Sequence, residues 1–368
     1  MIDPDELAAW LRLLETRTVG RESARRLLAS YGSPQAALAA SSASRETVVG
    51  TTAARALGAS SKAIDDLVFA TRAWLDAPGD TGREVITLGD PLYPAVLLET
   101  ADPPLLLYAQ GRTELLGRTG LAVVGSRNPT PQGSDNARAF ARHLSDAGVC
   151  VVSGLALGID GAAHEGALEG PGSTIAVVAT GLDRVYPRRH LELARRIARD
   201  GLLLSEHALG TPALPDQFPA RNRIIAGLSR ATLVVEAALK SGSLITARLA
   251  IEAGRDVFAI PGSIHSPLSR GCHALIKQGA KLVDSAHDVL EELQLDDPRR
   301  RPADPAGAPA SNPDALLEAL GFDPVGLEAL AARTGRSAAD LSSRLLEMEL
   351  DGAVVRLPGQ LFQRIAQG

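Results

Sequence analysis

The sequence predicts an α/β protein whose central part is a doubly wound parallel sheet. From about residue 84 onwards, short runs rich in Val and Ile alternate with helical stretches, as is typical of parallel strands joined by helices. The runs are nearly continuous in apolar residues, which indicates strands covered on both faces. We expect strands at 121–124, 149–152, 174–178, 202–204, 232–235 and 257–260. We expect helices at 131–147, 158–169, 189–200, 219–228, 243–254 and 271–279.

Residues 1–82 predict a small all-α domain in front of this central domain, which we place at 83–292. Leu7, Trp10 and Leu11 keep helical spacing, and further short helical patterns follow them. The turn at 18–20 resembles that of a helix-hairpin-helix or SAM-like module, although it has one glycine where DNA-binding hairpins usually have two. We therefore expect a structural or docking role for this domain.

Residues 314–368 predict a winged-helix domain, behind a proline-rich linker at 293–313. Three helical patterns are followed by a hairpin that turns at Pro358-Gly359. The expected recognition helix, 337–351, carries one arginine against four acidic residues, which are Asp340, Glu347, Glu349 and Asp351. Duplex phosphates would repel such a helix, so we expect a protein contact or a regulatory role.

Charge is unevenly distributed along the 368 residues. The chain has 38 Lys and Arg against 43 Asp and Glu, a net charge of −5. Between residues 112 and 281 the balance is 20 basic against 14 acidic residues, so this part carries +6 and the remainder −11. A basic middle between acidic ends suggests that the middle meets a polyanion. The alternative is chance, combined with the high arginine content.

Several classes of protein are excluded by composition. Two cysteines rule out a disulfide framework and any metal site built on Cys. The acidic start of the chain has no signal-peptide pattern, and no apolar run approaches the ~18 residues of a membrane span. We expect a cytoplasmic protein that does not enter membranes.

Small, flexible residues follow five of the predicted strands. They lie at 125–127, 153–158, 180–181, 240–243 and 261–262. In an open parallel sheet, ligands bind outside the carboxyl ends of the strands, where backbone N–H groups beside helix N-termini suit an anion. Any one of these loops could be an ordinary turn. Five on one edge, with Arg127 and Lys240 among them, indicate phosphate binding.

The familiar enzyme patterns are missing from these loops. The loop after the first strand breaks the dinucleotide pattern, and the chain has no P-loop and no nucleophile elbow. Asp160 and His164 lie four residues apart and could form an acid–base pair, although a helix-capping Asp bonded to His is the favoured interpretation. The His and Cys spacing gives no zinc pattern, and no carboxylates cluster for two metals. We expect no catalytic residues, no metal and no cofactor.

Arginines and one aromatic residue complete the predicted groove. Arg221 and Arg223 bracket Asn222 at the head of a helix, with Phe218 just before them, and Arg188 follows the third strand. Arginines for phosphates and an aromatic ring for a base are typical of single-stranded nucleic-acid binding. For Phe218, packing in the core is an equal alternative.

Five motifs of the central domain together resemble one known family. They read GSR at 125–127, SGLALGID at 153–160 with AH at 163–164, TGLD at 180–183 with YP at 186–187, FPARNRIIAGL at 218–228 and KSGSLITA at 240–247. Over about residues 85–285 the sequence resembles the DNA-processing protein A (DprA, or Smf) family, and the motifs are specific to it when taken together.

The resemblance implies an extended Rossmann-like domain that binds single-stranded DNA without hydrolysing it. It implies a homodimer that binds the recombinase RecA. Such a protein protects incoming DNA in natural transformation and helps RecA load onto DNA held by single-strand-binding protein, with DNA repair left open as a second setting. The alternative is a Rossmann-like hydrolase similar to the nucleotide phosphoribohydrolases. Their P-G-G-x-G-T-x-x-E loop corresponds to 240–247, where the glutamate is missing.

Site residues follow from the motif match. Arg127 and the backbone of Gly125 and Ser126 would hold phosphates, Phe218 would stack on a base, and Arg221 and Lys240 would line the groove. The full predicted set is Gly125, Ser126, Arg127, Gly154, Gly158, Arg188, Phe218, Arg221, Asn222, Arg223, Lys240, Ser241, Gly242 and Ser243. The sequence departs from the family at Pro215 and Asp216, where relatives have a lysine, and at Ala179, where a glycine is common.

Overall fold

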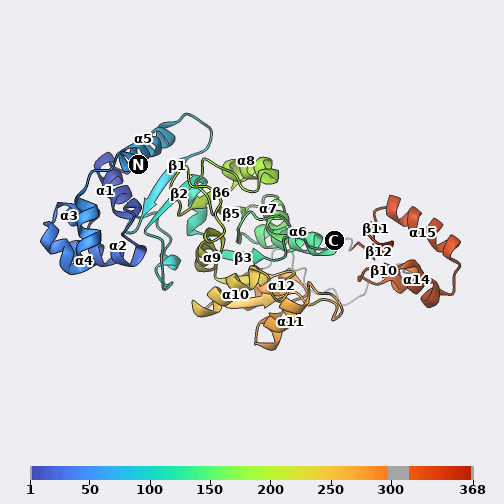
Figure 1. Ribbon diagram of the computed structural model, residues 1–368. Helices are drawn as coiled ribbons and strands as arrows, with labels where there is room; N and C mark the ends of the chain where they lie inside the picture. Colours follow the sequence, from blue (N-terminus) through green and yellow to red (C-terminus); the bar gives the residue numbers. More distant parts are fainter. Residues whose placement is uncertain (1, 297–314, 366–368) are drawn as a thin grey trace.

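A nine-stranded sheet forms the centre of the molecule in the computed structural model, which describes residues 2–296 and 315–365 (Figure 1). Its strand order is β1-β2-β6-β5-β4-β3-β7-β8-β9. The strands are β1 (Arg83–Thr87), β2 (Leu106–Gly111), β3 (Gly120–Val124), β4 (Cys150–Ser153), β5 (Thr174–Val177), β6 (Leu202–Ser205), β7 (Ala231–Val234), β8 (Asp256–Ala259) and β9 (Lys281–Leu282). The six predicted strands are present. The seven neighbouring strands β6-β5-β4-β3-β7-β8-β9 all pair in parallel, which confirms the predicted doubly wound sheet.

Three strands extend the sheet beyond the prediction: β9 pairs in parallel with β8 at one end, and β1 and β2 lie at the other. β1 pairs with β2 and β2 with β6, both antiparallel, so the sheet is mixed at this end. Antiparallel strands can follow each other through an ordinary loop, and they need no crossover helix. The alternation of strand and helix that revealed the parallel part therefore gave no signal here.

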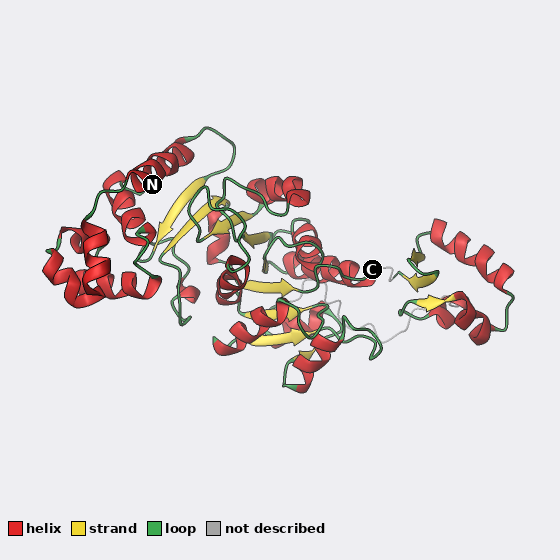
Figure 2. Cartoon of the chain, viewed as in Figure 1, coloured by secondary structure: helices red, strands yellow, loops and turns green. Residues whose placement is uncertain are grey.

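Helices cover both faces of the sheet (Figure 2). Ala122 and Val124 of β3 pack with α9 (Gln217–Leu228), α10 (Ser243–Glu252) and α11 (Arg270–Lys277). The intervening Leu121 and Val123 pack on the opposite face with α6 (Pro131–Asp146), α7 (Ile159–Ala167) and α12 (Ala286–Glu292). Successive side chains of a strand point to opposite faces, so a strand covered on both faces needs apolar residues throughout. α8 (Leu191–Asp200) packs further along, against β6.

The N-terminal domain is all-α, as predicted, and it packs on the β1–β2 end of the sheet. It consists of α1 (Pro4–Glu15), α2 (Arg21–Tyr31), α3 (Pro34–Ala39), α4 (Ser42–Gly58) and α5 (Lys62–Asp76). Trp10 shares a buried cluster with Val85 and Tyr108 of the sheet, and the Trp74 ring meets the Tyr108 ring edge-on at 6.0 Å. This domain is thus joined to the sheet through a continuous apolar core.

The C-terminal domain is a winged helix, as predicted. It consists of α13 (Ala315–Leu320), β10 (Val325–Gly326), α14 (Leu327–Thr334), α15 (Ala338–Leu350), β11 (Val354–Leu357) and β12 (Leu361–Arg364). Leu330, Leu341 and Leu345 are fully buried in its core. Most of the predicted linker at 293–313 lies outside the described residues. Among the helices of the described ranges, none is both long and apolar enough to span a membrane.

Candidate functional site

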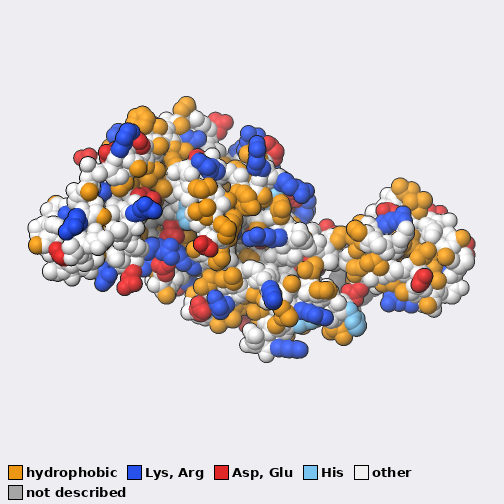
Figure 3. All heavy atoms as spheres, in the orientation of Figure 1, with side chains coloured by type: hydrophobic (Ala, Val, Ile, Leu, Met, Phe, Trp, Pro, Cys, Tyr) orange, Lys and Arg blue, Asp and Glu red, His pale blue; other side chains and the backbone are white. Residues whose placement is uncertain are grey.

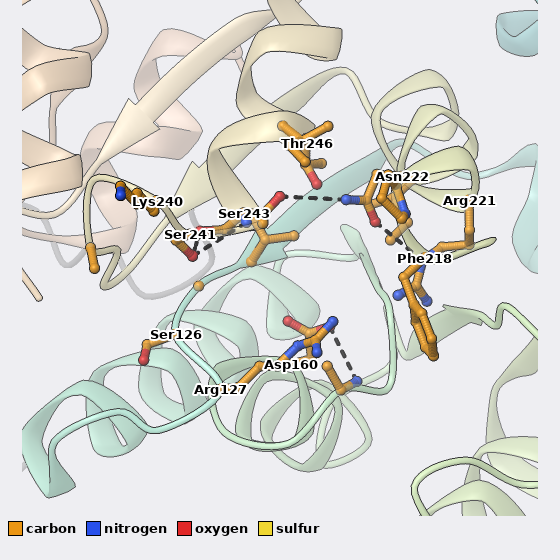
Figure 4. Close-up of a pocket in the computed structure, with 18 of the residues that line it drawn as sticks. Ser126, Arg127, Asp160, Phe218, Arg221, Asn222, Lys240, Ser241, Ser243 and Thr246 are labelled. Carbon is orange, nitrogen blue, oxygen red and sulfur yellow. Dashed lines mark hydrogen bonds between the residues drawn. The ribbon is translucent and has the colours of Figure 1, made fainter. Parts of the chain in front are cut away.

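A pocket of about 650 Å³ opens where the winding of the sheet reverses (Figure 4). β3 lies between β4 and β7, so the connections from β3 and β7 leave in opposite directions and open a crevice at their carboxyl ends. Ten predicted site residues line the pocket: Gly125, Ser126, Arg127, Phe218, Arg221, Asn222, Lys240, Ser241, Gly242 and Ser243. Lys240 and Phe218 lie towards opposite ends of it (Figure 4). We call this pocket the switch-point groove.

The loop after β3 packs tightly on the start of α7. A Cβ on Gly125 would lie 2.7 Å from a side-chain carbon of Ile159, and 2.9 Å from the carbonyl oxygen of Glu236. The Ile159 amide donates to the carbonyl of Ser126 at 3.1 Å, and the Ser126 hydroxyl accepts from the Asn128 amide at 3.1 Å. Because nothing larger than glycine fits at position 125, the loop holds Ser126 and Arg127 at the wall of the groove.

Arg127 and Phe218 meet across the groove. The central guanidinium carbon of Arg127 lies 5.6 Å from the centroid of the Phe218 ring, within the range of a cation–π contact. Arg127 is exposed and Phe218 is half-buried, so both can reach a molecule in the groove. A cation and a flat apolar surface therefore lie side by side in the groove.

Arg221 lines the groove, as predicted, but backbone carbonyls engage its guanidinium. Its side chain is buried, with 5% exposed, and Nη1 donates to the carbonyls of Gly154 (2.6 Å) and Val177. Nε donates to Asn222 at 3.2 Å. Burial lowers the pKa of Arg221 to about 10, so it stays cationic at neutral pH. Arg221 braces the loops after β4 and β5, and it adds positive charge beneath the groove.

Asp160 and His164 both hold the loop that follows β4. Oδ2 of Asp160 accepts from the amides of Gly154 (3.1 Å) and Ala156 (3.3 Å). Nε2 of His164 accepts from the Leu155 amide at 3.3 Å, and its Nδ1 lies 2.7 Å from the Thr174 hydroxyl. Burial lowers the pKa of His164 to about 3, so the ring is neutral at physiological pH. These bonds place the two side chains on backbone groups, which corrects both the acid–base pair and the Asp–His bond that we considered.

The loop after β7 forms the other wall. The hydroxyls of Ser241 and Ser243 lie 2.7 Å apart, and the Asn222 amide reaches the carbonyl of Gly242 at 3.5 Å. α10 begins at Ser243 after Gly242, which offers no side-chain cap, and the amides of Ser243, Leu244 and Ile245 donate within the loop to Ser241 and Gly242. The start of α10 therefore adds the positive end of its helix dipole to this wall. The exposed Lys240 adds a cation at the rim.

The other four predicted residues lie outside the lining of the groove. Gly154 stands against Arg221, whose guanidinium carbon would lie 2.7 Å from an added Cβ. Gly158 has a φ of +82° and supports the Ser126 loop from behind. Arg188 is exposed on the loop between β5 and α8.

Arg223 belongs to an ion cluster at the N-terminal domain. It pairs with Glu206 and, at 3.1 Å, with Asp102, and Asp102 also pairs with Arg21 at 2.8 Å. The Arg223 side chain is 13% exposed, and burial lowers its pKa. The cluster therefore joins α9 to α2, away from the lining of the groove, and a DNA contact at Arg223 stays a prediction.

The predicted set left out several residues that complete the groove. Its lining also includes Ala156, Asp160, Pro215, Ile225, Ala238 and Thr246. Ala156, Asp160, Ile225 and Thr246 stand within the motifs, which could have pointed to them, whereas Ala238 is a small residue that the sequence does not distinguish from a core residue. No group of three or more His, Cys, Asp or Glu in the described ranges could hold a metal ion.

Comparison with known proteins gives one consistent result. Residues 84–294 match the family described as DNA recombination-mediator protein A, residues 4–47 a DprA-like N-terminal HHH domain, and residues 300–360 a DprA winged helix domain. Protein Smf of Escherichia coli is 43% identical over 294 residues, which is 78% of each chain.

Two solved structures are similar in sequence and fold. The X-ray structure of DNA processing protein A from Streptococcus pneumoniae is 38% identical, with a TM-score of 0.65 over 78% of this chain and 97% of that one. The structure of DNA processing protein A from Helicobacter pylori was described for its single-stranded DNA binding mode. It is 32% identical, with a TM-score of 0.53 over 58% of this chain and 95% of that one.

Proposed function

The chain belongs to the DNA recombination-mediator protein A family, and on this premise we propose that it binds single-stranded DNA in the switch-point groove without hydrolysing it. The observation that carries the proposal is the contact of Arg127 with Phe218 beside two glycine- and serine-rich loops. Proteins that bind single strands combine cations for the phosphates with aromatic rings on which bases stack.

Each wall of the groove has a part in binding. Arg127 and Lys240 bind phosphates beside the positive end of the α10 dipole, and Phe218 stacks on a base. Arg221 acts through its charge, because its donors are engaged by backbone carbonyls. The lining carries three cations and one carboxylate, a balance that favours a polyanion.

We propose that the bound strand is an intermediate in recombination. The protein then protects incoming single-stranded DNA in natural transformation, and it helps load RecA onto DNA held by single-strand-binding protein, with DNA repair as a second setting. It acts as a cytoplasmic homodimer. The support for this part is the family membership and the similarity to relatives named for DNA processing.

The binding test is fluorescence anisotropy with a labelled oligonucleotide of about 35 nucleotides, single-stranded and then duplex, across a salt series. We expect tight binding of the single strand alone, and an affinity that falls steeply as salt rises. Absence of binding at low salt would contradict the proposal, and equal binding of duplex would contradict its strand preference.

A hydrolase is the competing function, and the groove offers it little. The carboxylate in the lining, Asp160, already accepts two backbone amides. The measurement is release of free base from nucleoside monophosphates. We expect none, and release that is abolished by Arg127→Ala would favour the hydrolase.

A further inference from the structure

Tyr186 is an exposed aromatic residue next to the switch-point groove. All four tyrosines lie in the described residues; Tyr93 and Tyr108 are buried and Tyr31 is half-buried, whereas Tyr186 is 52% exposed. A single exposed ring is common on protein surfaces, so what distinguishes Tyr186 is its place beside the groove and its contact with Phe218.

Tyr186 packs against the ring that we assign to base stacking. The centroids of the Tyr186 and Phe218 rings lie 5.6 Å apart, with their planes at 51°. Arg127 lies at the same distance from the Phe218 ring. Arg127 therefore lies over the Phe218 ring, and the Tyr186 ring lies beside it. Tyr186 itself is more than half exposed.

The loop that carries Tyr186 is fastened on both sides. The Thr180 hydroxyl donates to the carbonyl of Arg184 at 3.3 Å, and the Gly210 amide donates to Asp183 at 2.8 Å. Further along, Nδ1 of His190 lies 3.0 Å from the carbonyl of Leu155. A ring presented from such a loop loses little conformational entropy when a ligand stacks on it.

Exposed arginines surround Tyr186 on the same loop. Arg184, Arg188 and Arg189 are all exposed, and Arg184 is 3.4 Å from Asp183. Arg188 and Arg189 lie two and three residues after Tyr186, at the start of the turn that leads into α8. An exposed ring and exposed cations therefore follow one another along this loop, outside the lining of the groove.

We propose that Tyr186 stacks on the nucleotide next to the one held at Phe218, and that the strand leaves the groove past Tyr186 towards Arg188 and Arg189. The inference rests on the proposed function of the groove. It adds a second base contact and the direction of exit, and it gives Arg188, which lies outside the lining, a phosphate to bind.

A double-mutant cycle tests the stacking. Tyr186→Ala should weaken binding of a single-stranded oligothymidylate of about 12 nucleotides by about 5- to 100-fold, the range measured for loss of one base–aromatic stack. Tyr186→Phe should bind like the wild type. Tyr186→Ala should still weaken binding about 5-fold or more when it is added to Phe218→Ala.

A merely structural part for Tyr186 gives a different result. If the ring only braces Phe218, Tyr186→Ala has no further effect in the Phe218→Ala background, and the proposal is overturned. An oligomer of the same length without bases should bind the wild type and Tyr186→Ala equally, since it offers nothing to stack. A loss with that oligomer as large as with oligothymidylate would also overturn it.

The matched control is Phe69→Ala on α5, which removes another exposed aromatic ring, 76% exposed, from a different domain. It should leave affinity unchanged; an equal loss there would make the Tyr186 effect unspecific and overturn the inference. If the wild type binds and Phe218→Ala weakens it while Tyr186→Ala does not, the inference alone fails. If the wild type binds no single strand, the proposed function fails and the inference falls with it.

Discussion

The switch-point groove and helix α15 are both places where folds of their kind commonly meet nucleic acid, yet they carry opposite charge. The groove has Arg127, Arg221 and Lys240 against Asp160. The described side chains of α15 include three carboxylates, those of Asp340, Glu347 and Glu349, against one arginine, which pairs with Glu347 at 2.6 Å. A winged helix is therefore no evidence of duplex binding here, because the charge of its surface decides what it can meet.

The two regions also differ in what else they expose. On α15, Leu346 and Leu350 are 57% and 80% exposed and lie four residues apart, on one face of the helix. Lys and Arg side chains are spread over the central domain in Figure 3, whereas hydrophobic side chains cover much of the visible face of the winged helix. An apolar and acidic helix favours a protein partner, and this remains our prediction for the domain.

The largest expected effect is on the free energy of unfolding, where a charge of the groove is compared with a charge of α15. Arg221→Leu removes two bonds to backbone carbonyls and leaves the buried Asp160 without its nearest cation, so unfolding should become easier by about 3–5 kcal/mol. Chemical denaturation followed by circular dichroism measures the loss. The counterpart on α15, Glu349→Leu, should change stability by less than about 0.5 kcal/mol. Equal losses of stability in the two variants would mean that the buried Arg221 does not stabilise the fold.

The next effect concerns binding. Arg127→Ala should weaken single-strand binding about tenfold at every sequence, since it removes a phosphate contact and the cation beside Phe218. The slope of log affinity against log salt should become shallower by about 0.7. Anisotropy at four or five salt concentrations measures both. An unchanged affinity would remove Arg127 from the site, and an unchanged slope would show that it meets no phosphate.

A smaller effect is expected at the rim. Lys240→Ala removes an exposed cation that water and salt already screen, so affinity should fall only about two- to fivefold. Lys240→Arg keeps the charge and serves as the control. The same anisotropy titration applies. A loss of affinity larger than that of Arg127→Ala would mean that the loop after β7 contributes more to binding than the loop after β3.

The smallest effect tests the repulsion directly. Glu347→Lys combined with Glu349→Lys should leave single-strand affinity within about twofold, while duplex affinity at low salt should rise a few-fold as the net charge of α15 reverses. Titration of both DNA forms with the full chain measures this. Duplex binding by the wild type at physiological salt that disappears in this variant would contradict the acidic-helix argument.

Periodicity was sufficient to predict the parallel part of the sheet and its helices. Most residues of these strands are apolar, and each strand is followed by a helix, so the pattern is local and repeats. β1 and β2 escaped because they join the sheet in antiparallel fashion and no α-helix lies between the two in the chain. Their pairing depends on contacts far apart in the chain.

The motif around α9 did not predict where its two arginines point. Arg221 and Arg223 are two positions apart on a helix, so their side chains diverge by roughly 200° around its axis. Arg221 turns to the carbonyls beneath the groove, and Arg223 turns to the N-terminal domain. The partners of Arg223, Asp102 and Glu206, come from distant segments, and no local pattern announces such an ion pair.

Helix α9 has a consequence for how any mutational scan of this protein should be read. One end of it supplies Phe218 to the groove, and one turn later it supplies Arg223 to the cluster with Asp102 and Arg21. Arg223→Ala would weaken the packing of α9 against the N-terminal domain. A binding assay alone would attribute the resulting loss of affinity to a missing DNA contact. A melting curve recorded on the same sample separates a false positive of this kind from a side chain that touches the strand.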